Sequence, residues 1–240
     1  MNFKVIDLHM HVVPKVDDGA KSMDEAVDML RASISQGVSE VFCTSHNGYT
    51  KEQSLEYFKQ FEALGERVKN ENLNVRLHQG CEILTEESEI DDILYCVDKG
   101  YFPTLGNSKC ILLEFYTDVM PSEASNVVRK VVERGYLPII AHMERNYNLS
   151  EFMVGLLVEM GALVQINAYS LEAEMSEGRR DRARRLLHKG YVHFLGTDSH
   201  QLTHRPPRME KGVRYILGAV SEEYAKKVLY KNAERLILNR

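Results

Sequence analysis

Histidines and carboxylates recur along this chain just after short runs of apolar, β-branched residues. The first run, residues 5–8, leads into His9-Met10-His11. Residues two apart in an extended segment point to the same side, so His9 and His11 can share one metal ion. Asp18 lies in the loop that follows, and later runs end in the same way at His46, Glu82, Glu114, His142, Asp198 and His200.

These donors are nitrogens and oxygens without thiolates, a set that suits manganese, iron, zinc or magnesium. Crowded together, they would repel or desolvate one another unless cations compensated them. With three divalent ions and neutral imidazoles, six positive charges would exceed the four carboxylate charges by two. Such a site would attract a phosphate dianion and favour a metal-bound hydroxide.

Each signal has a plainer interpretation when it stands alone. An H-x-H at a strand end is about as often an ordinary half-buried histidine pair as a metal site. A single Glu82 or Glu114 is more often a paired or surface acid. The joint pattern is far more specific, because every member follows a strand.

Strands and helices alternate along the whole chain and must position these side chains. We expect strands at residues 5–8, 40–43, 75–77, 110–115, 137–141, 163–166 and 192–195. Helices are expected at 23–36, 51–70, 86–98 and 122–134, then two that end at Gly161 and Gly190, and two short ones that close the chain. This order predicts an α/β fold with parallel strands, and seven units favour a (β/α)7 barrel over an open sheet, although periodicity alone does not close the ring. In either fold the carboxyl ends of the strands share one face, where active sites form.

Composition sets the wider limits. The chain has 240 residues, 44% of them hydrophobic and 27% charged, which predicts a single domain spanning 1–240. A net charge of -5 argues against a nucleic-acid partner bound through a broad basic surface. We expect no integral membrane segment and no signal peptide. Four scattered cysteines are typical of a reduced, cytoplasmic protein.

Seven motifs together resemble the polymerase-and-histidinol-phosphatase (PHP) superfamily, from residue 5 to about residue 235. They are His9-x-His11, Asp18-Gly19, Thr44-x-His46, Gly80-x-Glu82, Leu113-Glu114-Phe115, Ala141-His142-x-Glu144-Arg145 and Thr197-Asp198-x-His200. The match is closer to its branch of bacterial manganese-dependent protein-tyrosine phosphatases of capsule and exopolysaccharide synthesis. Departures from that branch are Ser45 and Met143 where it usually has proline, and Asn47 where it often has histidine.

The resemblance implies a distorted (β/α)7 barrel and a three-metal site. One ion would be held by His9, His11, Glu82 and Asp198. A second would be held by Glu82, Glu114 and His142, with Glu82 bridging, and the third by Asp18, His46 and His200. The ions would be manganese, with iron or zinc as alternatives. Arg145 and Arg205 match positions where the family grips phosphate, a role suited to the guanidinium fork.

The activity implied is hydrolysis of phosphotyrosine on a protein by metal-activated water, the substrate being a bacterial tyrosine kinase that phosphorylates itself. No C-x5-R loop surrounds a cysteine, which argues against a phospho-cysteine mechanism. The main alternative is a small-molecule phosphatase of the histidinol-phosphatase type. A nuclease, an amidohydrolase and a metal-binding scaffold without turnover are weaker alternatives.

Two features lie outside this pattern. The arginine-rich run at residues 179–185 could contact an acidic phosphopeptide or a kinase, but we interpret it as a solvated helix face. Among the histidines outside the ligand set, His204 is the one that we expect to matter for function, because it adjoins Arg205.

Overall fold

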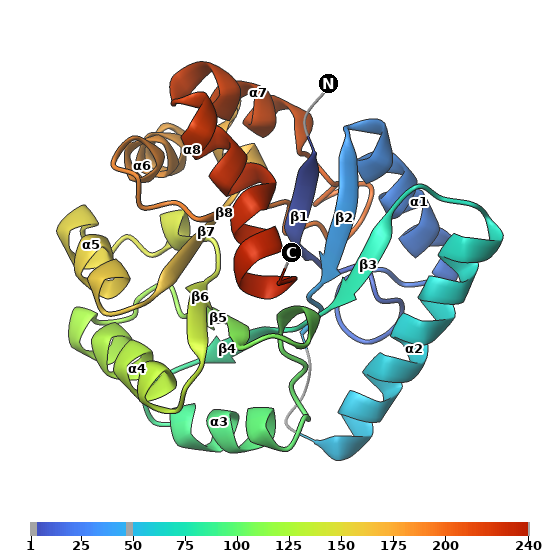
Figure 1. Ribbon diagram of the computed structural model, residues 1–240, viewed down its shortest axis with the longest axis horizontal. Coiled ribbons are helices and arrows are strands. Elements are labelled where there is room, and N and C mark those ends of the chain that lie inside the picture. The colour runs from blue at the N-terminus through green and yellow to red at the C-terminus, as the bar shows by residue number, and fades with distance from the viewer. Residues whose placement is uncertain (1–3, 47–49, 240) are drawn as a thin grey trace.

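Parallel strands ringed by helices make up the computed structural model, which describes residues 4–46 and 50–239, apart from the side chain of Leu236 (Figure 1). The strands are β1 (Val5–Met10), β2 (Val38–Cys43), β3 (Arg76–Gln79), β4 (Glu82–Thr85), β5 (Cys110–Phe115), β6 (Leu137–Ile140), β7 (Leu163–Asn167) and β8 (Phe194–Gly196). The α-helices are α1 (Met23–Ser35), α2 (Lys51–Asn70), α3 (Ile90–Asp98), α4 (Pro121–Glu133), α5 (Glu151–Glu159), α6 (Glu177–His188), α7 (Glu210–Ala219) and α8 (Glu222–Lys226). Short helical turns are η1 (Leu105–Asn107), η2 (Met143–Arg145) and η3 (Ala168–Leu171), and the last helix continues through η4 (Lys227–Lys231) and η5 (Ala233–Ile237). Asn47 lies outside the described residues.

The strands form two parallel sheets, β1-β2-β3 and β4-β5-β6-β7-β8. Single bridges join the sheets on both sides. Met10 pairs with Ser199, and the Asp198 amide donates to the His9 carbonyl over 2.7 Å. On the other side, the Glu82 amide donates to the Thr44 carbonyl over 3.1 Å. These bridges close the ring that periodicity left undecided, and the expected α/β barrel is confirmed.

The main correction to the expected elements lies between residues 76 and 89. The third expected strand continues past residues 80 and 81 as a second strand, β4, so β3 pairs with β2 while β4 pairs with β5. Counted as one bent strand, β3 and β4 leave seven β/α units in the ring. The helix expected from residue 86 begins instead at Ile90, because residues 86–89 form a turn that Asn126 and Glu123 of α4 hold by hydrogen bonds to Glu87.

An apolar cluster fills the inside of the ring, with side chains from β1, β2, β5, β6 and β8. The C-terminal helical segment completes it, since Ala233 and Ile237 are buried in the same cluster. In Figure 1 this segment lies across the centre of the ring. The expected closing helix is therefore packed as a plug against one end of the barrel, which leaves the opposite end for the site. Among the described residues no helix has both the length and the apolar character that a membrane span requires.

Helix α7 approaches the barrel closely at Gly212. A Cβ added there would lie 2.5 Å from the Ala168 carbonyl oxygen and 2.9 Å from the Ala168 Cα. Both are backbone atoms of Ala168, the first residue of η3, which follows strand β7. The bare backbone of Gly212 therefore sets how closely α7 packs on the segment that leads from β7 to the site.

We predict that Gly212→Ala lowers the free energy of unfolding by about 1–3 kcal/mol, because the overpacked methyl group forces α7 away from η3. Gly218→Ala in the same helix is the matched control, since no atom lies within 4 Å of its added Cβ. That change should leave stability unchanged or raise it by up to about 1 kcal/mol. Urea unfolding followed by circular dichroism measures both, and equal effects of the two substitutions would contradict the packing argument.

Candidate metal centre

Eight of the nine predicted metal-binding side chains lie at the carboxyl ends of the strands or in the loops that follow them, and the ninth, Glu82, is the first residue of β4, directly after the bend that follows β3. Their exposure is graded. Six are buried, and they come from β1 and the residue after it, from β4 and from the loops after β6 and β8: His9, His11, Glu82, His142, Asp198 and His200. The side chains of His46 and Asp18 are 40% and 65% exposed. The site thus has a buried part and an outer part that faces solvent.

Glu82 is the centre of the buried part. Its Oε2 lies 3.1 Å from His9 Nε2 and 3.2 Å from His11 Nε2, and its Oε1 lies 2.8 Å from His142 Nε2. Burial alone would raise the pKa of Glu82, but the charges and hydrogen bonds of the three histidines outweigh it and hold the pKa well below the usual value. Glu82 is therefore an anion with two oxygens facing different imidazoles, as a bridging ligand requires.

Three overlapping groups of donors could each hold a cation. One is the first expected ligand set, His9, His11, Glu82 and Asp198, whose donor atoms all lie within 4.8 Å of one another. The second group brings His46 to Glu82 and Glu114 within the same distance. His142, expected in this second set, places Nε2 3.3 Å from Glu114 Oε1, so it too faces both carboxylates.

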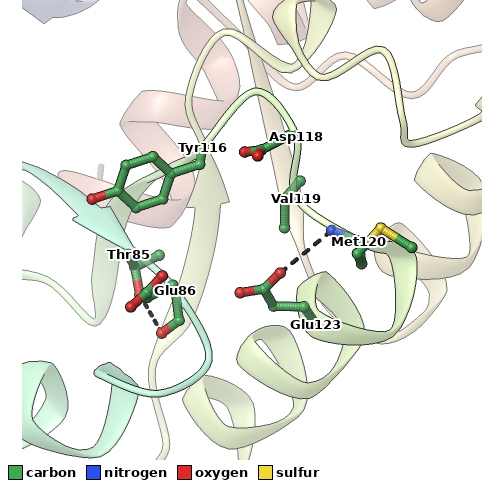
Figure 2. A pocket seen from close by; sticks show the side chains of 7 residues that line it. All are labelled: Thr85, Glu86, Tyr116, Asp118, Val119, Met120 and Glu123. Atoms are coloured by element: carbon green, nitrogen blue, oxygen red, sulfur yellow. Dashed lines mark hydrogen bonds between the residues drawn. The ribbon is translucent and has the colours of Figure 1, made fainter.

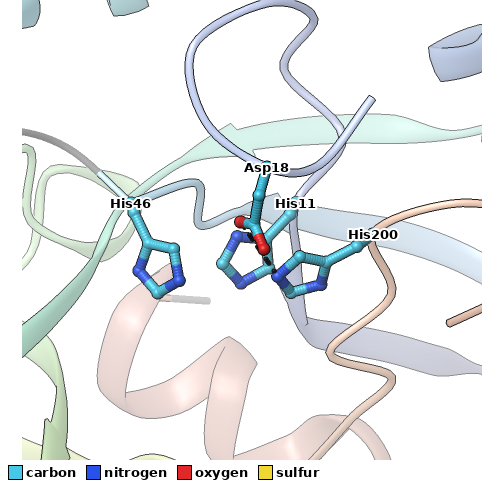
Figure 3. Close-up of side chains that lie close together, drawn as sticks. All are labelled: His11, Asp18, His46 and His200. Atoms are coloured by element: carbon cyan, nitrogen blue, oxygen red, sulfur yellow. Dashed lines mark ion pairs between the residues drawn. The ribbon is translucent and has the colours of Figure 1, made fainter. Parts of the chain in front are cut away.

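The third group is drawn in Figure 3 and contains His11 besides the expected Asp18, His46 and His200. The His11 and His200 rings stack with centroids 3.7 Å apart, and His200 Nε2 lies 3.4 Å from Asp18 Oδ1. Burial, the charge of His11 and that of Arg205 lower the pKa of His200 to about 3. His200 is thus a neutral imidazole, the form that binds metals.

The Nδ1 atoms of His9 and His11 are held by a second layer of residues. His11 Nδ1 lies 2.8 Å from Asp17 Oδ2, and His9 Nδ1 lies 3.2 Å from Gln165 Oε1. With Nδ1 fixed in this way, the Nε2 atoms of both rings point at Glu82, the arrangement usual for metal-bound histidine. The donor set and its orientation therefore fit divalent cations.

Asp17 directly precedes the expected ligand Asp18 in the sequence, but its side chain contacts His11. It also accepts hydrogen bonds from the amides of Gly19 and His46, over 2.8 and 2.9 Å. Burial alone would raise its pKa, but the hydrogen bond and charge of His11 lower it to about 2. Burial alone would lower the pKa of His11, yet Asp17 and Glu82 raise it to about 10, so a cation that binds His11 must displace a proton.

Sequence reasoning missed two further supporting residues. Asp7 accepts hydrogen bonds from the amide and hydroxyl of Thr197, and Gln165 accepts one from the His142 amide over 2.8 Å. Each is a fully buried polar residue with an apolar residue on either side of it in its strand. That signal could have identified them, because a buried polar group needs a partner.

The backbone is unusual at two of the expected ligands. His142 has φ 30° and ψ 52°, and Asp198 has φ 53°, both in the left-handed region that residues other than glycine rarely adopt. The Gln165 side chain holds the His142 amide, and the His9 carbonyl holds the Asp198 amide. Strained residues of this kind persist where surrounding contacts determine them, and they gather at functional sites.

Both expected phosphate-binding arginines reach the buried part. Arg145 Nη2 donates to Asp198 Oδ2 over 2.6 Å and to the Tyr169 hydroxyl over 2.8 Å. Arg205 Nη2 donates to Asp198 Oδ1 over 2.7 Å, and its Nη1 lies 2.9 Å from His200 Nε2. The two guanidinium groups thus flank Asp198 on separate oxygens. Together with bound cations, they would place positive charge around any anion that enters.

Comparisons with known proteins agree with this geometry. Residues 5–238 match the family model described as "Capsular polysaccharide synthesis, CpsB/CapC". The chain is 30% identical to the tyrosine-protein phosphatase CpsB of Streptococcus pneumoniae, over 98% of this chain and 99% of CpsB. It matches a solved structure from a study of YwqE of Bacillus subtilis and CpsB of S. pneumoniae, described as unique metal-dependent tyrosine phosphatases. That match has a TM-score of 0.83 at 29% identity and covers 98% of this chain and 95% of the other. An amidohydrolase structure from Mycoplasma synoviae matches with a TM-score of 0.60 at 14% identity, covering 97% and 87% of the two chains, and shows a shared fold alone.

We predict that Asp17→Asn weakens Mn²⁺ binding by roughly 10- to 100-fold, because it removes the charge that orients His11 and polarises its ring. Isothermal titration calorimetry at fixed pH measures the affinity. Asp28→Asn is the matched control, since Asp28 is an exposed aspartate whose salt bridge goes to Arg31. An affinity of the Asp17 variant equal to that of the control would show that Asp17 does not support metal binding.

Proposed function

Since the chain belongs to the CpsB/CapC family of capsular polysaccharide synthesis, we propose that it is a metal-dependent protein-tyrosine phosphatase. The observation that carries the proposal is the buried Glu82 carboxylate, which faces imidazoles on both oxygens, together with Asp198, which two arginines contact. The match over residues 5–238 also supports one catalytic domain spanning 1–240.

We propose three divalent ions, Mn²⁺ in the cell, with iron or zinc able to occupy the same donors. The sets are those expected from the sequence, and the donor groups at Glu82 and at Asp18 support them. When bound, the ions would acidify a water molecule and draw charge from the phosphoryl oxygens.

The protein's own groups would bind and orient the substrate. Arg145 and Arg205 are the proposed phosphate ligands, because a guanidinium group can offer two parallel N–H donors to phosphate oxygens. Tyr169 receives a hydrogen bond from Arg145 and would keep its guanidinium group in place. His46 and Asp18, on the outer side, lie where a protein-bound phosphotyrosine would enter.

The substrate is proposed to be a phosphotyrosine protein, and a tyrosine kinase of capsular or exopolysaccharide synthesis is the expected one. A cytoplasmic location is proposed with it, because the four cysteines are buried and their thiols are not joined in disulfides, as in reduced proteins. Hydrolysis of a small phosphate ester such as histidinol phosphate is the alternative that the first experiment must separate.

We predict Mn²⁺-dependent release of phosphate from a phosphotyrosine peptide, at a higher kcat/KM than from histidinol phosphate. A chelator and His200→Ala should each abolish it, because both remove the charge that activates water. A malachite-green phosphate assay with both substrates measures the rates. Turnover of histidinol phosphate alone would place the protein in the small-molecule branch. If both activities persisted in the presence of the chelator, the metal mechanism would be refuted.

We also predict that Arg145→Ala lowers kcat/KM for the peptide by roughly 10²–10³-fold, because a preorganised donor to the phosphoryl group is lost. Manganese content, measured by mass spectrometry, should stay equal to that of the unchanged protein. Arg129→Ala is the control, since Arg129 is a half-exposed arginine of α4 that pairs with Glu133. A fall in manganese content that accounts for the lost activity would place Arg145 in support of the metals instead.

A further inference from the structure

Two pockets open near the carboxyl ends of the strands, and their chemistry differs. The first, drawn in Figure 2, has a volume of about 350 Å³ and lies at the ends of β4 and β5. Among the described residues, its lining includes the carboxylates of Glu86, Asp118 and Glu123, and no lysine or arginine. Such a lining repels a phosphate dianion, so this pocket does not suit the phosphorylated group of a substrate.

The second pocket has a volume of about 190 Å³ and adjoins the metal centre directly. It is lined by Tyr169, Met175, Thr197, Asp198, His204, Arg205, Pro206 and Arg208. Asp198 is an expected metal ligand, and Arg205 is one of the two arginines beside it. The pocket therefore begins where the phosphoryl group of a substrate would lie.

Three of the residues that line this pocket have flat or apolar side chains. Tyr169, Met175 and Pro206 contribute an aromatic ring, a thioether and a pyrrolidine ring. The charge of Arg208 is already held by Glu172, to which its Nε donates over 3.2 Å. The remaining surface suits a hydrophobic group, and a thioether makes favourable contacts with aromatic rings.

The volume agrees with the size of a phenyl ring. An apolar cavity of about 150 Å³ is enough to hold benzene. A ring in this pocket could carry its phosphate toward Arg205 and Asp198, and a shorter alkyl phosphate would leave the walls uncontacted.

We propose that this second pocket is the aryl subsite, which receives the phenyl ring of a phosphotyrosine residue and gives the enzyme its preference for aryl over alkyl phosphates. The inference rests on the proposed phosphatase function and names its specificity-determining surface, with Met175 as the principal contact. His204, the histidine singled out in the sequence, forms part of the rim of the aryl subsite.

The test compares the binding of phenylphosphonate and methylphosphonate to the Mn²⁺-loaded full chain by isothermal titration calorimetry. Both ligands carry the same anionic group and neither is hydrolysed, so leaving-group chemistry does not enter. The unchanged protein should bind phenylphosphonate more tightly. Met175→Ala should weaken the binding of phenylphosphonate by about 3- to 10-fold and leave the affinity for methylphosphonate unchanged. Met175→Leu should restore most of the lost affinity for phenylphosphonate.

Met120→Ala is the matched control, because Met120 is a methionine of the acidic pocket and is 58% exposed. It should alter neither affinity. Equal binding of the two phosphonates, no binding of either, or equal weakening of both by Met175→Ala would overturn the aryl subsite. Selective weakening together with no turnover of phosphotyrosine peptide would support the subsite and refute the proposed function instead.

Discussion

One buried carboxylate determines much of this structure. Glu82 is 2% exposed, and an isolated charge at that depth would be expensive. It is tolerated because His9, His11 and His142 surround it, and these residues come from the ends of β1 and from the loop after β6. The carboxylate therefore ties strands that are distant in the sequence to one face of the barrel. The bend between β3 and β4 serves the same end, since it transfers the chain from β2 to β5 just where Glu82 begins the new strand.

A second layer of polar residues makes this arrangement specific. Gln165 holds both the His9 ring and the His142 amide, and it lies against the bare backbone of Gly196. A Cβ at Gly196 would come within 2.6 Å of the His9 Cβ, so glycine is required where β8 passes the first histidine. Asp7 fixes the segment after β8 through Thr197. Buried polar networks of this kind stabilise one geometry when every member has a partner.

The sequence predicted the barrel class and the convergence of all nine candidate ligands, because strand ends in parallel α/β folds share one face. It did not predict β4, whose four residues are too short to register as a separate strand. Asp17 and Gln165 were also not assigned, since their partners are set by loop conformation and by neighbouring strands. The run at residues 179–185 was interpreted as a solvated helix face, which is wrong for Arg182. Arg182 is 5% exposed and donates to the carbonyls of Asn146 and Leu149.

The position of Arg182 follows a helical periodicity that its charge concealed. Arg182 and Ala183 share the buried face of α6 with Leu186 and Leu187, at the spacing of an apolar stripe. Its guanidinium group binds the loop that carries Arg145, so α6 supports a proposed phosphate ligand from behind. The basic helix is thus connected to the site through the backbone of that loop. The buried charges of Glu82, Asp198 and Arg182 thus each have defined partners, and these contacts position the side chains that would bind a phosphorylated substrate.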